Sequence, residues 1–318
     1  MTANNGDTVY LVIPCYNEEE VLPETASRLK IIMQGMIERK VISEDSSILF
    51  VNDGSIDETW NIIKRLHQED SMFKGVDLSR NKGHQNALIA GLTEAAKYAD
   101  MVISLDADLQ DDVNAIEQFI KKYHEGFDIV YGVRSSRKKD TFFKRFTAEG
   151  FYKLMSFLGV DIVFNHADYR LMSKRALEGL GEYQEKNLFL RALIPQIGYP
   201  STTVEYERNE RFAGESKYPL RKMLSFAFDG ITSFSIRPIR MVTNCGALFC
   251  IIAFVIAVWA IMEKILGNTV SGWASIMVSI WFVGGVLMLG LGIVGEYIGK
   301  IYKEVKGRPR YIIKEKLY

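Results

Sequence analysis

Residues 101–110 read MVISLDADLQ, a short β-rich run that ends in two acidic side chains, Asp106 and Asp108. Three similar runs precede it in the sequence and one follows it. Longer segments whose apolar residues recur at helical spacing separate the runs. These runs are YLVIPCY (10–16), SSILFVND (46–53), KGVDLS (74–79) and FDIVYGV (127–133). Strands that alternate with helices in this way predict an α/β domain with a mainly parallel sheet.

Polar residues follow three of these runs at the point where each predicted strand ends. They are the segments 14–18 (PCYNE), 52–55 (NDGS) and 106–110 (DADLQ). Each segment alone is also compatible with an ordinary turn or a helix cap. Because α/β sheets bind ligands at the carboxyl ends of their strands, the three together predict a site at one edge of the sheet.

The acidic pair of the fourth segment predicts a divalent metal. Asp106 and Asp108 are two residues apart, so in an extended segment both side chains point to one face, and Gln110 continues the series. Their oxygens suit Mg²⁺ or Mn²⁺, and magnesium typically adds substrate phosphates to one or two carboxylates. The four histidines form no close pair and the three cysteines no cluster in the sequence, which disfavours zinc.

Two long uncharged runs occupy the last third of the chain. Residues 241–262 and 272–295 are each long enough to cross a hydrocarbon layer of ~30 Å as a helix. Buried core helices are the alternative, but two adjacent runs of this length are hard to bury. Cations flank the pair on its outer sides, at Arg237, Arg240, Lys300, Lys303, Lys306, Arg308 and Arg310. By the positive-inside rule, the N-terminal region and the C-terminal tail are both expected in the cytoplasm.

Seven motifs occur in one order before these runs: PCYNEEE, VNDGSIDET, SRNKGHQNAL, DADLQD, YGVRSSR, DYRLMS and GESKYPLRK. In this order, and followed by two apolar runs, they closely resemble the polyprenyl-phosphate glycosyltransferases of family 2, which have the GT-A fold. That group includes bactoprenol glucosyltransferases and is similar to dolichyl-phosphate mannose synthases. The resemblance extends over essentially the whole chain.

The resemblance implies a division of the chain into four parts. Residues 1–218 would form a cytoplasmic, Rossmann-like GT-A catalytic domain with a mainly parallel sheet. Residues 219–237 would form an amphipathic helix at the membrane surface, although packing against the catalytic domain explains its apolar stripe equally well. Residues 238–298 would be a hairpin of two transmembrane helices, and residues 299–318 a cytoplasmic tail. The protein would then be a multi-pass protein of the plasma membrane.

The resemblance also implies roles for individual residues. The nucleotide would be bound by Pro14, Tyr16, Glu18, Asp53 and Asp106. The metal on the donor's diphosphate would be held by Asp108 and Gln110, with Asp106 beside them, and Asp108 would thereby take part in catalysis.

Asp168 matches the position of a catalytic carboxylate in the family. A phosphomonoester has a second pKa near 6, so the attacking oxygen of a lipid phosphate is already largely ionised at neutral pH. Asp168 is therefore either a base or a group that orients the acceptor, Arg170 or a cation, and a helix cap is a further alternative.

Basic residues are candidates for binding the acceptor's phosphate, two of them after the last predicted strand and two in the loop before the predicted surface helix. They are Arg134, Arg137, Arg211 and Lys217. Attraction to anionic headgroups is the alternative explanation for such a basic patch.

The predicted reaction is an inverting transfer of one sugar from a UDP-sugar to polyprenyl phosphate, undecaprenyl phosphate in a bacterium, at the cytoplasmic face of the membrane. Glucose or N-acetylglucosamine is favoured over mannose and galactose. A homo-oligomer is expected from the resemblance. A nucleic-acid partner is not, because the chain carries 39 basic and 39 acidic residues. The alternatives are a processive polysaccharide synthase, a nucleotidyltransferase, and a non-catalytic lipid-binding or flippase-partner protein.

Overall fold

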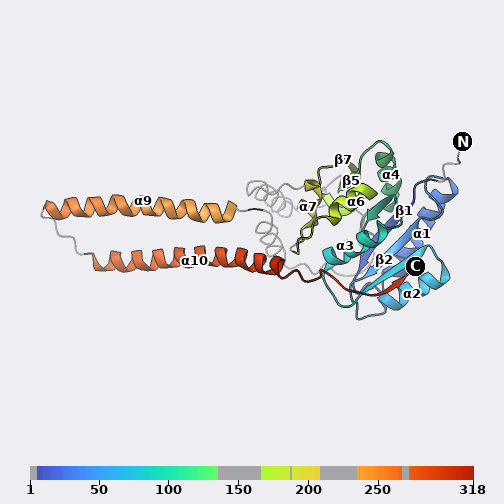
Figure 1. Ribbon diagram of the computed structural model, residues 1–318, viewed down its shortest axis with the longest axis horizontal. Helices are drawn as coiled ribbons and strands as arrows, with labels where there is room; N and C mark the ends of the chain where they lie inside the picture. The colour runs from blue at the N-terminus through green and yellow to red at the C-terminus, as the bar shows by residue number, and fades with distance from the viewer. Residues whose placement is uncertain (1–5, 135–165, 187, 208–234, 236, 267–271) are drawn as a thin grey trace. The chain divides into compact units, whose positions relative to one another are not determined.

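The computed structural model describes residues 6–134, 166–186, 188–207, 235, 237–266 and 272–318 (Figure 1). These residues fall into two compact units. The first contains an eight-stranded sheet with its helices and ends with Arg308–Tyr318, and the second contains two long helices. Three predicted site residues, Arg137, Arg211 and Lys217, lie outside the described residues, as does nearly all of the predicted surface helix at 219–237.

The sheet of the first unit is mixed, with six strands running in one direction. Its order is β7-β5-β6-β4-β1-β2-β3-β8. The strands β1 to β4 form a parallel block, β7 is parallel to β5, and β6 and β8 run antiparallel to their neighbours. The strands are β1 (Val9–Cys15), β2 (Ser47–Asn52), β3 (Phe73–Leu78), β4 (Met101–Ser104), β5 (Ile129–Arg134), β6 (His166–Ser173), β7 (Ser201–Tyr206) and β8 (Ile313–Leu317).

The five predicted strands correspond to β1 through β5, so the α/β class is confirmed. The prediction of a mainly parallel sheet did not anticipate that β6 lies between β4 and β5 and runs against both of them.

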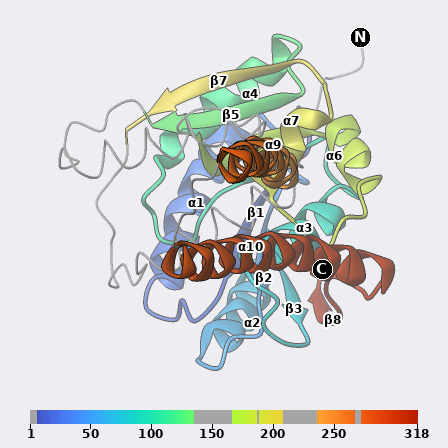
Figure 2. The ribbon, with the colours of Figure 1, turned by 90° about the vertical axis from the view of Figure 1, so that its left-hand side faces the viewer.

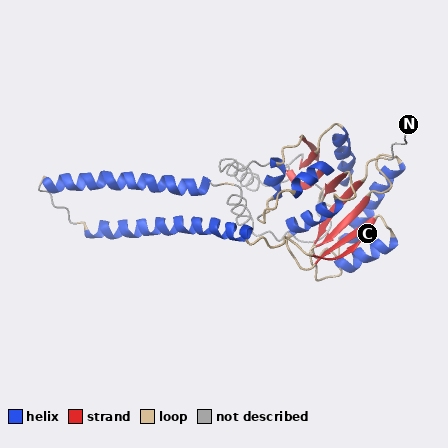
Figure 3. Ribbon diagram, viewed as in Figure 1, coloured by secondary structure: helices blue, strands red, loops and turns tan. Residues whose placement is uncertain are grey.

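Helices cover both faces of the sheet, which explains why β1 and β2 are buried along their full length. On one face, α1 (Leu22–Glu38), α2 (Thr59–Glu69) and α4 (Ile116–His124) share a continuous apolar core with the strands. On the other face lie α3 (His84–Ala95), which packs on β1 and β2, and α6 (Lys174–Gly181), which contacts α3 (Figure 3). The first unit is completed by the 3-10 turn η1 (Val113–Ala115) and by α7 (Leu190–Gln196).

The C-terminal strand β8 returns to the sheet and pairs with β3 at its edge (Figure 2). Side chains fix it to the underlying elements at three points. The Lys314 ammonium lies 3.0 Å from Asp77 of β3, and that of Lys316 lies 2.8 Å from Glu94 of α3. The indole of Trp60 donates a hydrogen bond to Glu315. Much of the segment predicted as a tail is therefore part of the folded first unit.

The second unit consists of α9 (Arg237–Ile265) and α10 (Trp273–Val305). The rings of Phe249 and Phe282 meet at 5.7 Å between centroids, and Val242 lies against Gly290. The predicted run 241–262 falls within α9, and the run 272–295 falls within α10 from Trp273 onward.

By length and composition, one helical segment among the described residues could cross a membrane. It is Phe282–Val305, with a mean hydropathy of 1.7, and its apolar window of 18 residues contains no buried residue. The second predicted span therefore has a structural counterpart that is displaced toward the C-terminus. The same criterion does not identify the first predicted span, so the pair of spans is not confirmed.

Two glycines inside helices provide a matched test of the packing of α3. A Cβ atom at Gly91 would lie 2.4 Å from Val12 and 2.6 Å from Val51, whereas a Cβ at Gly35 of α1 would meet nothing within 4 Å among the described atoms. We expect Gly91→Ala to lower the free energy of unfolding by about 1–3 kcal/mol through overpacking, because valine side chains are stiff.

The control Gly35→Ala is expected to raise that free energy by up to about 1 kcal/mol through helix propensity. Thermal or denaturant unfolding of both variants measures the difference. Equal effects of the two substitutions would contradict the close packing of α3 on the sheet.

Candidate active site

The loops after β1 and β2 lie side by side at the carboxyl edge of the sheet, as predicted. The backbone N–H of Asn17 donates to the hydroxyl of Ser55 at 3.0 Å, and that of Glu18 donates to the hydroxyl of Thr59 at 2.9 Å. The Asn17 side chain in turn accepts a hydrogen bond from the N–H of Ile56. Two of the three predicted polar segments are therefore held together by hydrogen bonds.

The predicted nucleotide residues of these loops differ in how accessible they are. Pro14 is buried in β1, Glu18 is half-buried and Tyr16 is 45% exposed. Asp53 is buried, and its two carboxylate oxygens accept hydrogen bonds from the backbone N–H groups of Lys82 and Gly83, at 2.7 and 2.9 Å. Asp53 thus holds the loop that leads into α3. Its predicted role toward the nucleotide stays a prediction.

The loop after β2 also touches the loop after β3, at Gly54. This glycine has φ +64°, and a Cβ atom there would lie 2.5 Å from backbone atoms of Arg80 and Asn81. Only glycine fits both the left-handed backbone and the close approach. The two loops therefore form one continuous surface at the ends of β2 and β3.

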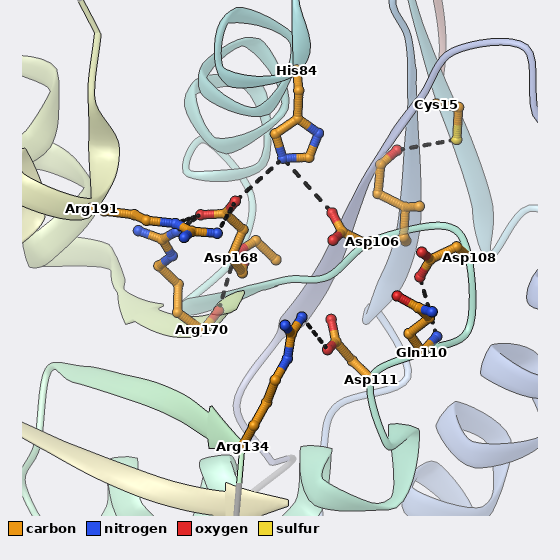
Figure 4. A network of polar contacts seen from close by, with 12 residues as sticks. Cys15, His84, Asp106, Asp108, Gln110, Asp111, Arg134, Asp168, Arg170 and Arg191 are labelled. Atoms are coloured by element: carbon orange, nitrogen blue, oxygen red, sulfur yellow. Dashed lines mark hydrogen bonds and ion pairs between the residues drawn. The ribbon is translucent and has the colours of Figure 1, made fainter. Parts of the chain in front are cut away.

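The antiparallel pairing of β4 with β6 brings Asp106 and Asp168 together. Ser104 pairs with Arg170, and each step forward on β4 is a step back on β6, so the same register continued two residues past the end of β4 leads to Asp106 opposite Asp168. The Ser104 hydroxyl also donates to the Asp168 carbonyl at 2.7 Å. Two of the predicted site residues, 62 positions apart in sequence, are thus neighbours in the structure (Figure 4).

His84 lies between these two carboxylates, and the sequence analysis did not identify it as a site residue. Its Nε2 atom is 3.7 Å from Asp106 and 3.8 Å from Asp168 (Figure 4). His84 is the first residue of α3 and follows Gly83, whose backbone Asp53 holds. The signal in the sequence was its position in the motif SRNKGHQNAL, which contributes to the family resemblance.

Two guanidinium groups hold the Asp168 carboxylate on its other side. The Arg170 Nη2 atom is 2.5 Å from Asp168 and that of Arg191 is 3.3 Å from it. Burial raises the pKa of Asp168, but the charges of Arg191, Arg170 and His84 outweigh it and hold that pKa well below its usual range. A carboxylate with so low a pKa is a weak base, which favours an orienting role for Asp168 over proton abstraction.

Arg170 depends on this ion pair, because its side chain is fully buried. Its Nε and Nη1 atoms have no hydrogen-bond partner within the part of the chain that the structure describes. The sequence analysis named Arg170 only as one of the groups that Asp168 could orient, and it did not name Arg191. Arg170 lies in the motif DYRLMS, whereas nothing in the sequence around Arg191 distinguishes it.

Asp108 does not share a face with Asp106, which corrects the geometric prediction. The strand ends at Ser104, and the chain turns at Ala107–Leu109, where Leu109 has φ +56°. The alternation of an extended segment therefore no longer applies. Asp106 points toward His84, whereas Asp108 accepts a hydrogen bond from the Gln110 N–H at 3.2 Å (Figure 4). The buried hydroxyl of Thr25 donates to the Ala107 carbonyl and fixes the turn.

Negative charge accumulates around Asp106. Burial raises the pKa of its carboxyl group, and the charges of Asp168 and Asp108 raise it further, while His84 lowers it. A divalent cation would relieve this repulsion, and the carboxylate of Asp108 with the amide of Gln110 fits Mg²⁺ or Mn²⁺ as donors, with Asp106 nearby. Among the described residues, no group of three or more His, Cys, Asp or Glu side chains is placed to hold a metal ion. One or two carboxylates completed by water and substrate phosphates remain the fitting arrangement.

Asp111 and Arg134 form a second polar pair beside these residues. Asp111 is buried next to Asp106, and burial together with that charge raises its pKa to about 6. It accepts a hydrogen bond from the Tyr206 hydroxyl at 2.5 Å and lies 3.9 Å from the Arg134 guanidinium. Arg134, at the end of β5, is the one predicted phosphate-binding residue that the structure describes, and it does lie at this site (Figure 4).

Comparison with known proteins shows the family to which the chain belongs. The family model for glycosyl transferase family 2 matches residues 10–181, which contain β1 through β6 and the residues described above. An uncharacterized glycosyltransferase of Bacillus subtilis, YkoT, is 55% identical over 97% of this chain and 91% of its own length. The SfII prophage-derived bactoprenol glucosyl transferase of Shigella flexneri is 40% identical over 96% of this chain and 97% of its own.

Similarity to solved structures is lower. A mannosyl-3-phosphoglycerate synthase from Rubrobacter xylanophilus has a TM-score of 0.48 and 15% identity, over 75% of each chain.

The family match and the relatives favour a transferase over the non-catalytic alternative, and the mixed α/β sheet is of the GT-A type. The chain belongs to glycosyl transferase family 2 and is a glycosyltransferase.

Proposed function

We propose that this enzyme transfers one sugar, glucose or N-acetylglucosamine, from a UDP-sugar to undecaprenyl phosphate or a related polyprenyl phosphate at the cytoplasmic membrane face. The observation that carries the proposal is the acidic site at the sheet edge, Asp106 opposite Asp168 with His84 between them, in a chain that aligns over nearly its whole length with a bactoprenol glucosyl transferase.

The donor nucleotide would bind along the loops after β1 and β2. Tyr16 is exposed there, Glu18 is half-buried, and Pro14 and Asp53 shape the loops from beneath. Asp106 would contact the ribose or a water molecule near it. The bound nucleotide would then present its diphosphate to the turn that carries Asp108 and Gln110.

A divalent cation, Mg²⁺ or Mn²⁺, would be held by Asp108 and Gln110 with Asp106 nearby. When bound, such an ion neutralises charge that builds up on the departing nucleoside diphosphate. The protein's own part is to fix the turn at Ala107, which the Thr25 hydroxyl holds in place.

The acceptor would bind with its phosphate facing Arg134 and Arg191, whose guanidinium groups lie at the site (Figure 4). An oxygen of this phosphate would attack the anomeric carbon from the face opposite the departing UDP, so that one C–O bond forms as the other breaks and the configuration inverts. The attacking oxygen is already ionised at neutral pH. Asp168 would orient the acceptor through Arg191 and His84, and most of the acceleration would come from positioning and electrostatics.

The topology of the chain supports a membrane hairpin. Strand β8 lies in the same sheet as β1 to β7, so the chain before α9 and the chain after α10 are on one side of any membrane. An even number of crossings must lie between them. If α10 crosses through Phe282–Val305, then α9 must also cross. Its exposed apolar side chains, such as Phe254 and Trp259, suit that position.

The metal assignment predicts the behaviour of Asp108→Asn. This variant should transfer sugar at least about 100-fold more slowly at saturating Mn²⁺, because the charge that holds the ion is lost while the side chain keeps its size. Transfer of label from UDP-glucose and UDP-N-acetylglucosamine into the lipid fraction measures the rate. Asp112→Asn is the matched control, because Asp112 caps η1 in the same loop, and it should stay within about twofold of the wild type. Equal rates for the two variants would refute the metal role.

The orienting role predicts the pH dependence of Asp168→Asn. The wild-type rate should fall below about pH 6 as the lipid phosphate takes up a proton. Asp168→Asn should lower kcat and keep this acid limb, because the pKa of Asp168 is depressed far below that range.

Asp111→Asn controls for the other group that titrates there, since the pKa of Asp111 is raised to about 6. This variant should also keep the limb. Loss of the limb in Asp168→Asn alone would instead identify Asp168 as the base. Because Arg170 is buried against Asp168, the melting temperature of the variant is measured alongside.

The hairpin predicts the accessibility of single cysteines placed at its two ends. In a chain with its three native cysteines replaced by serine, Leu266→Cys should react in intact cells with a membrane-impermeant thiol reagent. Tyr318→Cys should react only after the cells are permeabilised, because β8 lies on the catalytic side. Labelling of both positions from the same side would contradict two crossings.

A further inference from the structure

A cavity of about 360 Å³ lies at the carboxyl ends of β2 and β3. Its lining comes from two loops of the candidate site, the one after β2 that contains Gly54 and Ser55, and the one after β3 that contains Arg80 and Asn81. In the sequence, two of its lining residues, Asn52 and Gly54, flank Asp53, which is predicted to contact the nucleotide. A third part of its lining is Lys314, which belongs to β8 and reaches the site only because the chain returns to the sheet after α10.

Lys314 compensates a buried acidic group at the base of this cavity. Asp77 is 3% exposed and also lines the cavity. One of its oxygens accepts a hydrogen bond from the Asn52 amide at 2.7 Å, and the other lies 3.0 Å from the Lys314 ammonium. Burying a carboxylate without a paired cation is costly, so Lys314 is the group that makes the Asp77 charge tolerable.

The charges of the lining favour an anion. Asp77 carries one negative charge, and Lys314 and Arg80 carry one positive charge each, so the lining is cationic by one unit. Arg80 is exposed and has no ion-pair partner among the described residues. Without Lys314 the sum falls to zero, and the uncompensated carboxylate of Asp77 faces the space where a nucleoside diphosphate would enter.

We propose that β8 forms one wall of the donor-nucleotide pocket, and that Lys314 is a positioning residue that keeps this pocket attractive to a nucleoside diphosphate by neutralising Asp77. The inference deepens the proposed function and rests on it. Donor binding then depends on the strand that follows the apolar helices, so the part of the chain beyond α10 contributes to the donor site as well as closing the sheet.

The test is binding of UDP, with Mn²⁺ present, to the full-length protein in detergent, measured by calorimetry. A unit charge about 10 Å from an anion, at an effective dielectric constant of about 20, changes its binding roughly tenfold. Lys314→Ala should therefore weaken UDP binding about tenfold. Lys314→Arg, which keeps the charge, should stay within about twofold of the wild type.

Two further variants separate this effect from a general loosening of the strand. Lys316→Ala removes the neighbouring ion pair of β8 with Glu94, away from the cavity, and should leave UDP binding within about twofold of the wild type. The double variant Asp77→Asn, Lys314→Ala removes the charge that Lys314 neutralises, and should restore most of the lost affinity.

Unchanged binding in Lys314→Ala, equal losses in Lys314→Ala and Lys316→Ala, or no recovery in the double variant would each overturn the inference while leaving the proposed function in place. If the wild-type protein binds UDP no better than it binds other nucleoside diphosphates, the UDP-sugar donor is wrong, and the inference fails with it.

Discussion

The pairing of β4 with β6 is the constraint on which the candidate site depends. β6 follows a long intervening segment and enters the sheet antiparallel, between two strands that run the other way. This reversal places Asp168, near the start of β6, opposite Asp106, just past the end of β4. A parallel strand at this position would have placed its own carboxyl end there instead. The acidic site is therefore a product of sheet topology, and the loops on either side serve to hold its members in position.

The sequence was sufficient to predict the central strands and the edge at which the site lies. Apolar runs that end in polar residues are informative for β1, β2 and β4, because strands buried on both faces must be apolar throughout. The same reasoning fails for β6 and β8. The segment HADYRLMS contains Asp168, Tyr169 and Arg170, and IKEKL of β8 alternates charges, so neither has the pattern of a buried strand. Their places in the sheet are set by pairing partners distant in the chain.

The sequence predicted which residues form the site more readily than how these residues are arranged. Asp106 and Asp168 were identified from motifs, but their direct opposition follows from a register that no local pattern encodes. His84 and Arg191 were missed because a lone histidine at a helix start, or an arginine in an apolar helix, gives no chemical signal until the fold brings carboxylates next to it. Asp108 was identified correctly and oriented incorrectly, because the turn at Leu109 requires a backbone conformation that is rare for leucine.

The transfer would need more positive charge than the groups around Asp168 provide. The carboxylates of Asp106, Asp111 and Asp168 lie beside Arg134, Arg170, Arg191 and His84, and Asp108 adds a fourth negative charge from the turn after β4 (Figure 4). Arg170 is already committed to Asp168. The donor's diphosphate and the acceptor's phosphate would each bring about two further negative charges. One divalent cation offsets only part of this sum. Arg137, Arg211 and Lys217, which the sequence predicts to bind the acceptor's phosphate, would supply the rest of this charge balance when the acceptor binds.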